Sequence, residues 1–166
     1  MADKKYPFKI KQKVVYPSQG VGVINAITER EFNGQKAPYF VIYLEVTDMT
    51  IMAPVEKAEE LGIRAIVPAE EAQKALEFIG EAFEPNPSDW KLRYQMNMDL
   101  LKKGTVMDIA AIVRSLYHRS KVKELPIMER KLYESAKKLF EDELSYALKK
   151  NKDEIETLIH DRLESR

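Results

Sequence analysis

The hydrophobic patterning of this 166-residue chain changes abruptly between Val67 and Pro68, and that break limits the folds it can adopt. Up to Val67, runs of β-branched and aromatic residues alternate with turn residues, which is typical of short strands. From Pro68 onward, apolar residues recur at helical spacing. The pattern predicts an α+β protein with two parts, a small antiparallel β module over residues 1–67 and a compact α-helical domain over residues 68–166.

The N-terminal part carries clear strand and turn signals. In KVVYPSQGVGVI a turn over residues 17–20 follows the first strand. Asn33-Gly34 is a strong hairpin signal, because both positions tolerate positive φ. PYFVIYLEV and TIMAPVEK supply further strands. Four or five strands in about sixty residues predict a strongly bent antiparallel sheet or a partial barrel.

Five helices are expected in the C-terminal part. They should begin near Pro68, Asn86, Val106, Pro126 and Asp153. Asn86 is expected to cap the second helix, with Pro87 in its first turn and Asp89 completing a near capping box, and Gly104 should end it. The third helix carries an amphipathic stripe made of Val106, Ile109, Ala110, Val113, Leu116 and Tyr117.

The residue types argue against several classes of chemistry. The chain has no cysteine, which excludes thiol catalysis and disulfides and suits a cytoplasmic protein. The two histidines, His118 and His160, lie in different predicted helices without metal-ligand spacing. No phosphate-binding loop, nucleophile motif or membrane-length apolar run occurs. We therefore expect no catalysis, no metal, no cofactor and no membrane contact.

Charge is unevenly distributed along a chain whose formal net charge is zero. Residues 68–89 carry one Lys against six Asp and Glu, whereas residues 90–131 carry ten Lys and Arg against four acids, a local excess of six positive charges. A local basic excess is typical of contact with nucleic acid, although charged runs are more often just solvated surface. Both interpretations remain open on charge alone.

The helix that follows Asn86 contains Trp90, the only tryptophan. Around that helix, Leu92, Met96 and Leu100 form one apolar stripe; Trp90, Tyr94, Met98 and Leu101 form another, and Arg93 and Asn97 lie between the two. Periodicity favours a core role for Trp90. Nearby basic residues, including a flank of Arg114, His118 and Lys121 on the next helix, favour an exposed ring beside a nucleic-acid contact surface.

Several segments together resemble bacterial transcription regulators of the CarD/CdnL type. They are KVVYPSQGVGVI, YFVIYLEV, TIMAPVEKAEELGIR, DWKLRY, IVRSLYHRS and ERKLYESAKKLFEDEL, and the resemblance runs from about Phe8 to Leu148. It implies a Tudor/SH3-like N-terminal module that docks on the β subunit of RNA polymerase. It also implies a helical domain that faces promoter DNA, where a tryptophan at the position of Trp90 wedges into the minor groove and helps the open complex persist.

The resemblance, with the charge pattern, assigns candidate site residues. The expected DNA contacts are Trp90, Lys91, Arg93, Arg114, Arg119 and Lys121, and the expected polymerase contacts are Arg30, Met52 and Pro54. Met52 as a core residue and Pro54 as a simple strand terminator remain the alternatives. Leu92 and Gln95 depart from the family pattern, because relatives commonly carry basic residues there.

The expected protein is a non-catalytic transcription regulator of the cytoplasm, associated with the nucleoid through RNA polymerase. It should bind promoter DNA without sequence specificity and act as a monomer. The alternative is a protein-interaction adaptor, whose β module binds polymerase or another partner while its helices bind protein instead of DNA.

Overall fold

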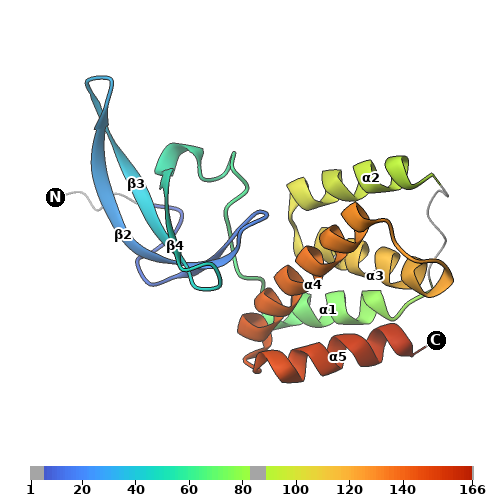
Figure 1. Ribbon diagram of the computed structural model, residues 1–166. Coiled ribbons are helices and arrows are strands. Elements are labelled where there is room, and N and C mark those ends of the chain that lie inside the picture. The colour runs from blue at the N-terminus through green and yellow to red at the C-terminus, as the bar shows by residue number, and fades with distance from the viewer. Residues whose placement is uncertain (1–5, 83–88, 166) are drawn as a thin grey trace. The chain divides into compact units, whose positions relative to one another are not determined.

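The computed structural model describes residues 6–82 and 89–165, and the chain divides into two compact units, Met1–Ile66 and Val67–Arg166. The first unit is a β sheet and the second a group of helices (Figure 1). The predicted α+β class, with an antiparallel β module preceding a helical domain, is confirmed.

The N-terminal unit is a five-stranded antiparallel sheet of order β4-β3-β2-β1-β5. Its strands are β1 (Lys13–Tyr16), β2 (Gly20–Phe32), β3 (Gln35–Leu44), β4 (Met49–Pro54) and β5 (Arg64–Ala65), and a 3₁₀ turn (Val55–Lys57) follows β4. The predicted hairpin turn is present, because Asn33 and Gly34 have φ values of 54° and 77° between β2 and β3. The register of β2 shifts between Ile24 and Ala26, which marks a bulge in this long strand.

One face of the sheet builds the core of the N-terminal unit. Its buried residues are Phe8, Val14, Ile24, Phe40, Ile42, Leu44, Ala53, Ala58 and Ile63. Gly22 sits where β2 crosses this core, and a Cβ atom there would lie 2.6 Å from Cγ2 of Ile42. A side chain at position 22 would therefore force neighbouring atoms of the core to move.

The described residues of the C-terminal unit form five helices around an apolar core. They are α1 (Ala69–Ile79), α2 (Trp90–Lys103), α3 (Val106–Val122), α4 (Ile127–Leu148) and α5 (Lys152–Glu164). Helix α3 packs against α1, α2 and α4, and α5 packs against α1 and α4. The stripe predicted for α3 is confirmed, because all six of its residues are buried.

The second helix begins later than predicted. The expected capping residue, Asn86, and the expected first-turn residue, Pro87, lie outside the described residues. Asp89 is extended and is itself the cap, since its side chain accepts a hydrogen bond from the backbone N–H of Lys91 at 3.1 Å. Trp90 is therefore the first residue of α2. Gly104, in the left-handed conformation with φ of 71°, ends the helix as predicted.

Candidate functional site

Trp90 is a partly exposed side chain at the very start of α2. Its exposed fraction is 36%, and it is absent from the buried core that α2 helps to form. The core role that periodicity favoured is therefore wrong. Lys91 beside it is also exposed, so an aromatic ring and a cation share the first turn.

Arg93 was expected to contact DNA, and the structure contradicts this. Its side chain is only 2% exposed, and its guanidinium donates to Glu129 of α4 through Nε–H at 2.7 Å. A second hydrogen bond joins Nη2 to the other carboxylate oxygen. Glu129 itself is fully buried. A guanidinium held inside the protein by a carboxylate cannot bind a phosphate at the surface.

The sequence contained a signal for this pair that the charge count obscured. Arg93 lies between the two apolar stripes of α2, where a residue faces the interior whatever its type. Glu129 likewise continues the line of buried α4 residues that includes Leu132, Ala136 and Phe140. A basic residue and an acidic residue, each on an inward-facing line, predict a buried ion pair.

The remaining predicted cations lie on α3. The guanidinium of Arg114 is half-buried; it lies 3.8 Å from the ring centroid of Phe78 in α1 and donates to the Phe78 carbonyl oxygen at 3.3 Å. Lys121 is exposed, 3.5 Å from the Glu164 carboxylate of α5. Arg119 is half-buried. Arg114 thus contacts α1, and Lys121 contacts α5.

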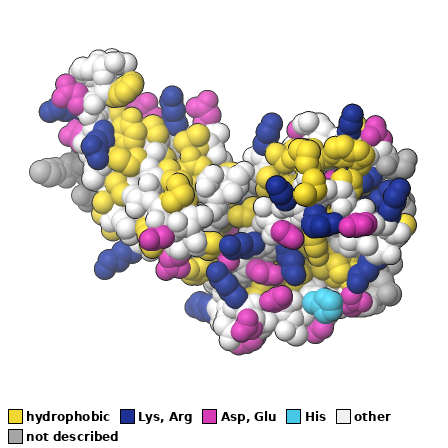
Figure 2. Space-filling model, viewed as in Figure 1, with side chains coloured by type: hydrophobic (Ala, Val, Ile, Leu, Met, Phe, Trp, Pro, Cys, Tyr) yellow, Lys and Arg dark blue, Asp and Glu magenta, His cyan; other side chains and the backbone are white. Residues whose placement is uncertain are grey.

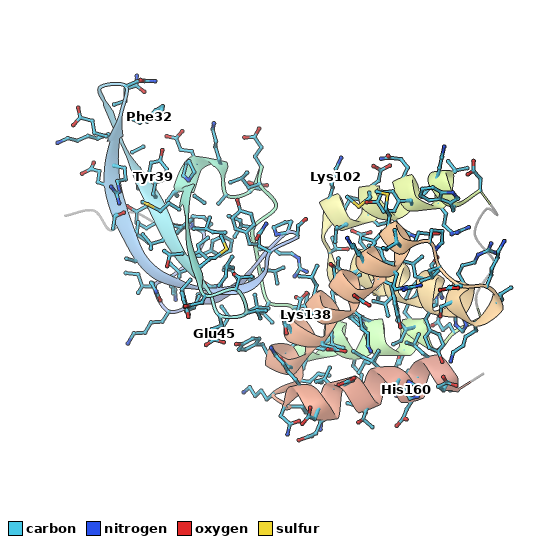
Figure 3. The ribbon with its side chains drawn as sticks, in the orientation of Figure 1. Phe32, Tyr39, Glu45, Lys102, Lys138 and His160 are labelled. Carbon is cyan, nitrogen blue, oxygen red and sulfur yellow. The ribbon has the colours of Figure 1, made fainter. Side chains whose placement is uncertain are left out.

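Apolar side chains are exposed along α2 and at the start of α4. Leu92 is 51% exposed and Met96 44%, and Ile127 and Met128 are exposed in the first turn of α4. Figure 2 shows hydrophobic side chains gathered on the face of the helical unit where α2 lies. Ile127, Met128 and the exposed Lys102 at the end of α2 (Figure 3) are not among the residues predicted to form a site.

The three predicted contact residues of the β unit share one face of the sheet. Met52 pairs with Val41, Pro54 with Tyr39, and Arg30 with Ala37. Since side chains alternate between faces along a strand and paired residues share a face, all three project opposite the core. Figure 3 labels Tyr39, the paired residue at the centre of this face.

The exposure of Arg30, Met52 and Pro54 agrees with their placement on the sheet face opposite the core. Met52 and Arg30 are exposed and Pro54 is half-buried, so the alternative of Met52 as a core residue is wrong. Pro54 does end β4, and it precedes the 3₁₀ turn. Among the strands of the described residues, β4 lies at the edge of the sheet and pairs with β3 on one side, and an edge strand can accept main-chain hydrogen bonds on its other side.

Residues 6–82 and 89–165 contain neither a metal-binding cluster nor a membrane-spanning helix. No group of three or more His, Asp or Glu side chains is arranged there to hold a metal ion. None of the helices described is both long and apolar enough to cross a bilayer.

Comparison with known proteins places the two units in one family. Residues 8–67 match the CarD-like/TRCF RID domain, and residues 74–160 match the CarD C-terminal domain. The chain is 36% identical over 141 residues to YdeB, a candidate transcription factor of Bacillus subtilis (strain 168), covering 82% of this chain and 90% of YdeB.

A solved structure is also similar to part of the chain. It is the solution NMR structure of the 72-residue N-terminal domain of Myxococcus xanthus CarD, with 30% sequence identity and a TM-score of 0.32. The match covers 38% of this chain and 84% of that domain. With an N-terminal CarD-like/TRCF RID domain, a CarD C-terminal domain and a full-length relative, this chain belongs to the CarD family.

Proposed function

We propose that this protein is a non-catalytic transcription regulator that binds the β subunit of RNA polymerase and stabilises the promoter open complex with Trp90 as a minor-groove wedge. The observation that carries the proposal is the placement of Trp90, a 36%-exposed aromatic ring in the first turn of a capped helix. In this proposal the protein acts as a monomer in the cytoplasm and reaches the nucleoid through polymerase.

Membership of the CarD family supports the coarse part of this function. Both domains match models from a family of transcription factors, and the N-terminal match is to a domain type that interacts with RNA polymerase. The β subunit, the promoter and the wedge are finer statements, and the geometry of each unit supports them separately.

The β unit suits a protein partner that adds a strand. An open sheet edge binds an extended segment by main-chain hydrogen bonds, and side chains beside the edge then set specificity. Strand β4 supplies the edge, and the sheet face with Arg30, Met52 and Pro54 supplies side chains next to it.

The helical unit suits a DNA contact that depends on shape. An apolar wedge costs a few kcal/mol of base unstacking and recovers it by holding a step that is already kinked or melted. With Arg93 buried, the cations available on α2 are Lys91, Lys102 and Lys103. So few phosphate contacts give weak, salt-sensitive and non-specific DNA affinity, and polymerase supplies the local concentration.

The test is the lifetime of the open complex on one promoter, measured with polymerase and each protein variant. Trp90→Ala should shorten the lifetime because the wedge is lost, and Met52→Asp should shorten it by weakening polymerase binding. Met107→Ala is the control for the first, since Met107 is 40% exposed in the first turn of α3. Met49→Asp is the control for the second, because Met49 is exposed on the same strand but alternates to the opposite side.

If Trp90→Ala and Met52→Asp both leave the lifetime unchanged while remaining folded, the proposal fails. Unchanged binding to polymerase by Met52→Asp would remove the β unit from the interface.

A protein-interaction adaptor is the second candidate, because the exposed side chains of α2 and α4 are largely apolar. Leu92 and Ile127, 51% and 66% exposed, suit a protein surface better than a phosphate backbone. An adaptor would keep its effect on transcription in Trp90→Ala and lose it in Leu92→Asp. It would also show no crosslink between α2 and promoter DNA.

A further inference from the structure

The ion pair between Arg93 and Glu129 joins the first turns of two helices. The backbone N–H of Arg93 bonds to the Asp89 carbonyl oxygen at 3.0 Å and closes the first turn of α2. Glu129 is the acidic residue of the first turn of α4. Both side chains are buried, at 2% and 0% exposure, and two hydrogen bonds connect the guanidinium to the two carboxylate oxygens.

Helix α2 is attached to the unit by polar as well as apolar side chains, since Tyr94, Met98 and Leu100 pack against the apolar core. Its fully buried residues are Arg93, Asn97 and Leu101, whereas those of α3 are apolar apart from Ser115 and the hydroxyl of Tyr117. Apolar packing is non-directional and tolerates rotation of a helix about its axis. A two-point guanidinium–carboxylate contact has a fixed plane and direction, so it sets the rotation of the helix that carries it.

Burial of apolar side chains would also favour a second rotation of α2 about its own axis. Leu92, Met96 and the half-buried Leu100 form a continuous apolar stripe beside the buried line, and two of them are largely exposed. Turning α2 by less than the roughly 100° that separates adjacent residues would bury this stripe. The same turn would carry Trp90, on the other side of Arg93, further out of the unit. The ion pair opposes that turn, because its hydrogen bonds would break inside the protein.

We propose that Arg93 and Glu129 are positioning residues, whose ion pair holds α2 at the rotation that presents the Trp90 ring to its target. The proposal rests on the proposed function, in which Trp90 contacts promoter DNA. Arg93 then serves the DNA contact from inside the protein, through the orientation of its helix. It makes no contact with DNA itself.

The experiment replaces the pair with apolar residues of similar volume, in the double variant Arg93→Met/Glu129→Leu. Such a replacement commonly keeps the stability of a buried site while removing its directional contact. The control is Lys74→Met/Glu70→Leu on α1, where an ion pair at 3.7 Å is exposed on both sides. Arg93→Lys is a second test variant, because it keeps the charge but loses the planar two-point contact.

Three quantities are measured for each variant in the full chain. They are the urea midpoint of unfolding, acrylamide quenching and anisotropy of the single tryptophan, and the open-complex lifetime with polymerase. For the double variant we expect an unchanged or higher midpoint, a higher quenching constant, a lower anisotropy and a lifetime shortened to that of Trp90→Ala. The control should match the parent chain in all three. Arg93→Lys should reproduce the quenching change below its unfolding transition.

The outcomes separate this inference from the proposed function. If the folded double variant and Arg93→Lys keep the parental quenching constant and anisotropy, the positioning role is overturned, whatever the effect on the open-complex lifetime. A second outcome is that the tryptophan signals of the double variant change while its open-complex lifetime stays parental and Trp90→Ala shortens the lifetime. In that case the orientation of α2 does not matter for the contact between Trp90 and DNA, so this inference fails and the proposed function stands. If Trp90→Ala itself has no effect, the proposed function fails, and the fluorescence still decides whether the pair orients the helix.

Discussion

Tyr117 of α3 and Glu164 of α5 form a hydrogen bond that couples two titrating groups. The phenol O–H donates to the carboxylate, and burial with this bond raises the pKa of Tyr117. The same bond is the largest cause of a lowered pKa for Glu164, with a smaller contribution from Lys121. Because the folded-state pKa of Glu164 is lowered, its contribution to stability is present above the unfolded-state pKa and is lost as pH falls through the folded value.

Replacing Tyr117 with Phe should raise the pKa of Glu164 toward its ordinary value of 4.5, because the donor is lost. Carboxyl-carbon NMR titration of Glu164 measures this directly. Tyr133→Phe is the control: burial raises the pKa of Tyr133 to about 12, but that phenol is not among the causes of the Glu164 shift. A Glu164 pKa that stays the same in Tyr117→Phe would contradict the assignment.

Gly22 is the second residue whose effect is local. In Gly22→Ala the new methyl group would lie 2.6 Å from Ile42 Cγ2 and 3.1 Å from the Tyr43 carbonyl oxygen. Overpacking of this kind costs about 1–3 kcal/mol of unfolding free energy, which urea titration of the protein would measure. Gly34→Ala is the comparison, because no atom lies within 4 Å there and only the φ of +77° opposes a side chain, at a cost of about 1–2 kcal/mol. A Gly22→Ala variant as stable as the parent would show that the sheet can move apart at this crossing.

At the scale of elements, helix starts are the features most clearly explained by local chemistry. Thr105 caps α3 through a full capping box: its hydroxyl oxygen accepts from the Asp108 N–H at 3.1 Å, and the Asp108 carboxylate accepts from the Thr105 N–H at 3.3 Å. Asn151 caps α5 in a similar way, accepting from the Glu154 N–H at 2.9 Å.

Removing the Thr105 cap should destabilise the helical unit by about 1 kcal/mol, because the backbone N–H of Asp108 in the first turn of α3 loses its acceptor. Thermal unfolding followed by circular dichroism at the helix band measures the change in Thr105→Ala. Thr157→Ala is the control, since the Thr157 hydroxyl only donates to a carbonyl one turn back within α5. Equal losses in both variants would argue that the methyl group, and not the cap, carries the effect.

At the scale of the whole molecule, the described residues form two separate apolar cores. One contains residues of the sheet and the other contains residues of the five helices, and no buried residue is shared between them. The division between Ile66 and Val67 lies one residue before the break in the sequence pattern. The first helix is also secured within its own unit, because the Val67 N–H donates to the buried Glu143 of α4 at 3.1 Å.

Each unit should therefore fold when expressed alone. A fragment of residues 67–166 should keep its helical circular dichroism and the parental Trp90 emission, since Trp90 lies in that unit. Residues 1–66 should be less stable, because a sheet of this size buries a smaller fraction of its surface. A helical fragment that unfolds in isolation, or a tryptophan emission that shifts on cutting, would show that the two cores depend on one another.

Local patterns in the sequence were sufficient for the outline of the fold. Alternation of apolar residues, the Asn33-Gly34 turn and the stripe on α3 depend on neighbours along the chain, so strands, hairpin and helices could be predicted from residue order. The start of α2 could not, because Asn86 and Asp89 are both good caps and only the backbone conformation selects between them.

The candidate sites needed partners from distant parts of the chain. Arg93 looked like a surface cation because its partner, Glu129, is 36 residues away. The helical periodicity around each residue indicates burial, but it does not identify the partner. The shared face of Arg30, Met52 and Pro54 likewise depends on strand register, which is set by pairing across the sheet. The sequence alone determined which elements form, since periodicity is a local property. Tertiary structure decided which side chains are buried together and which remain free to bind, because burial is a property of the assembled unit.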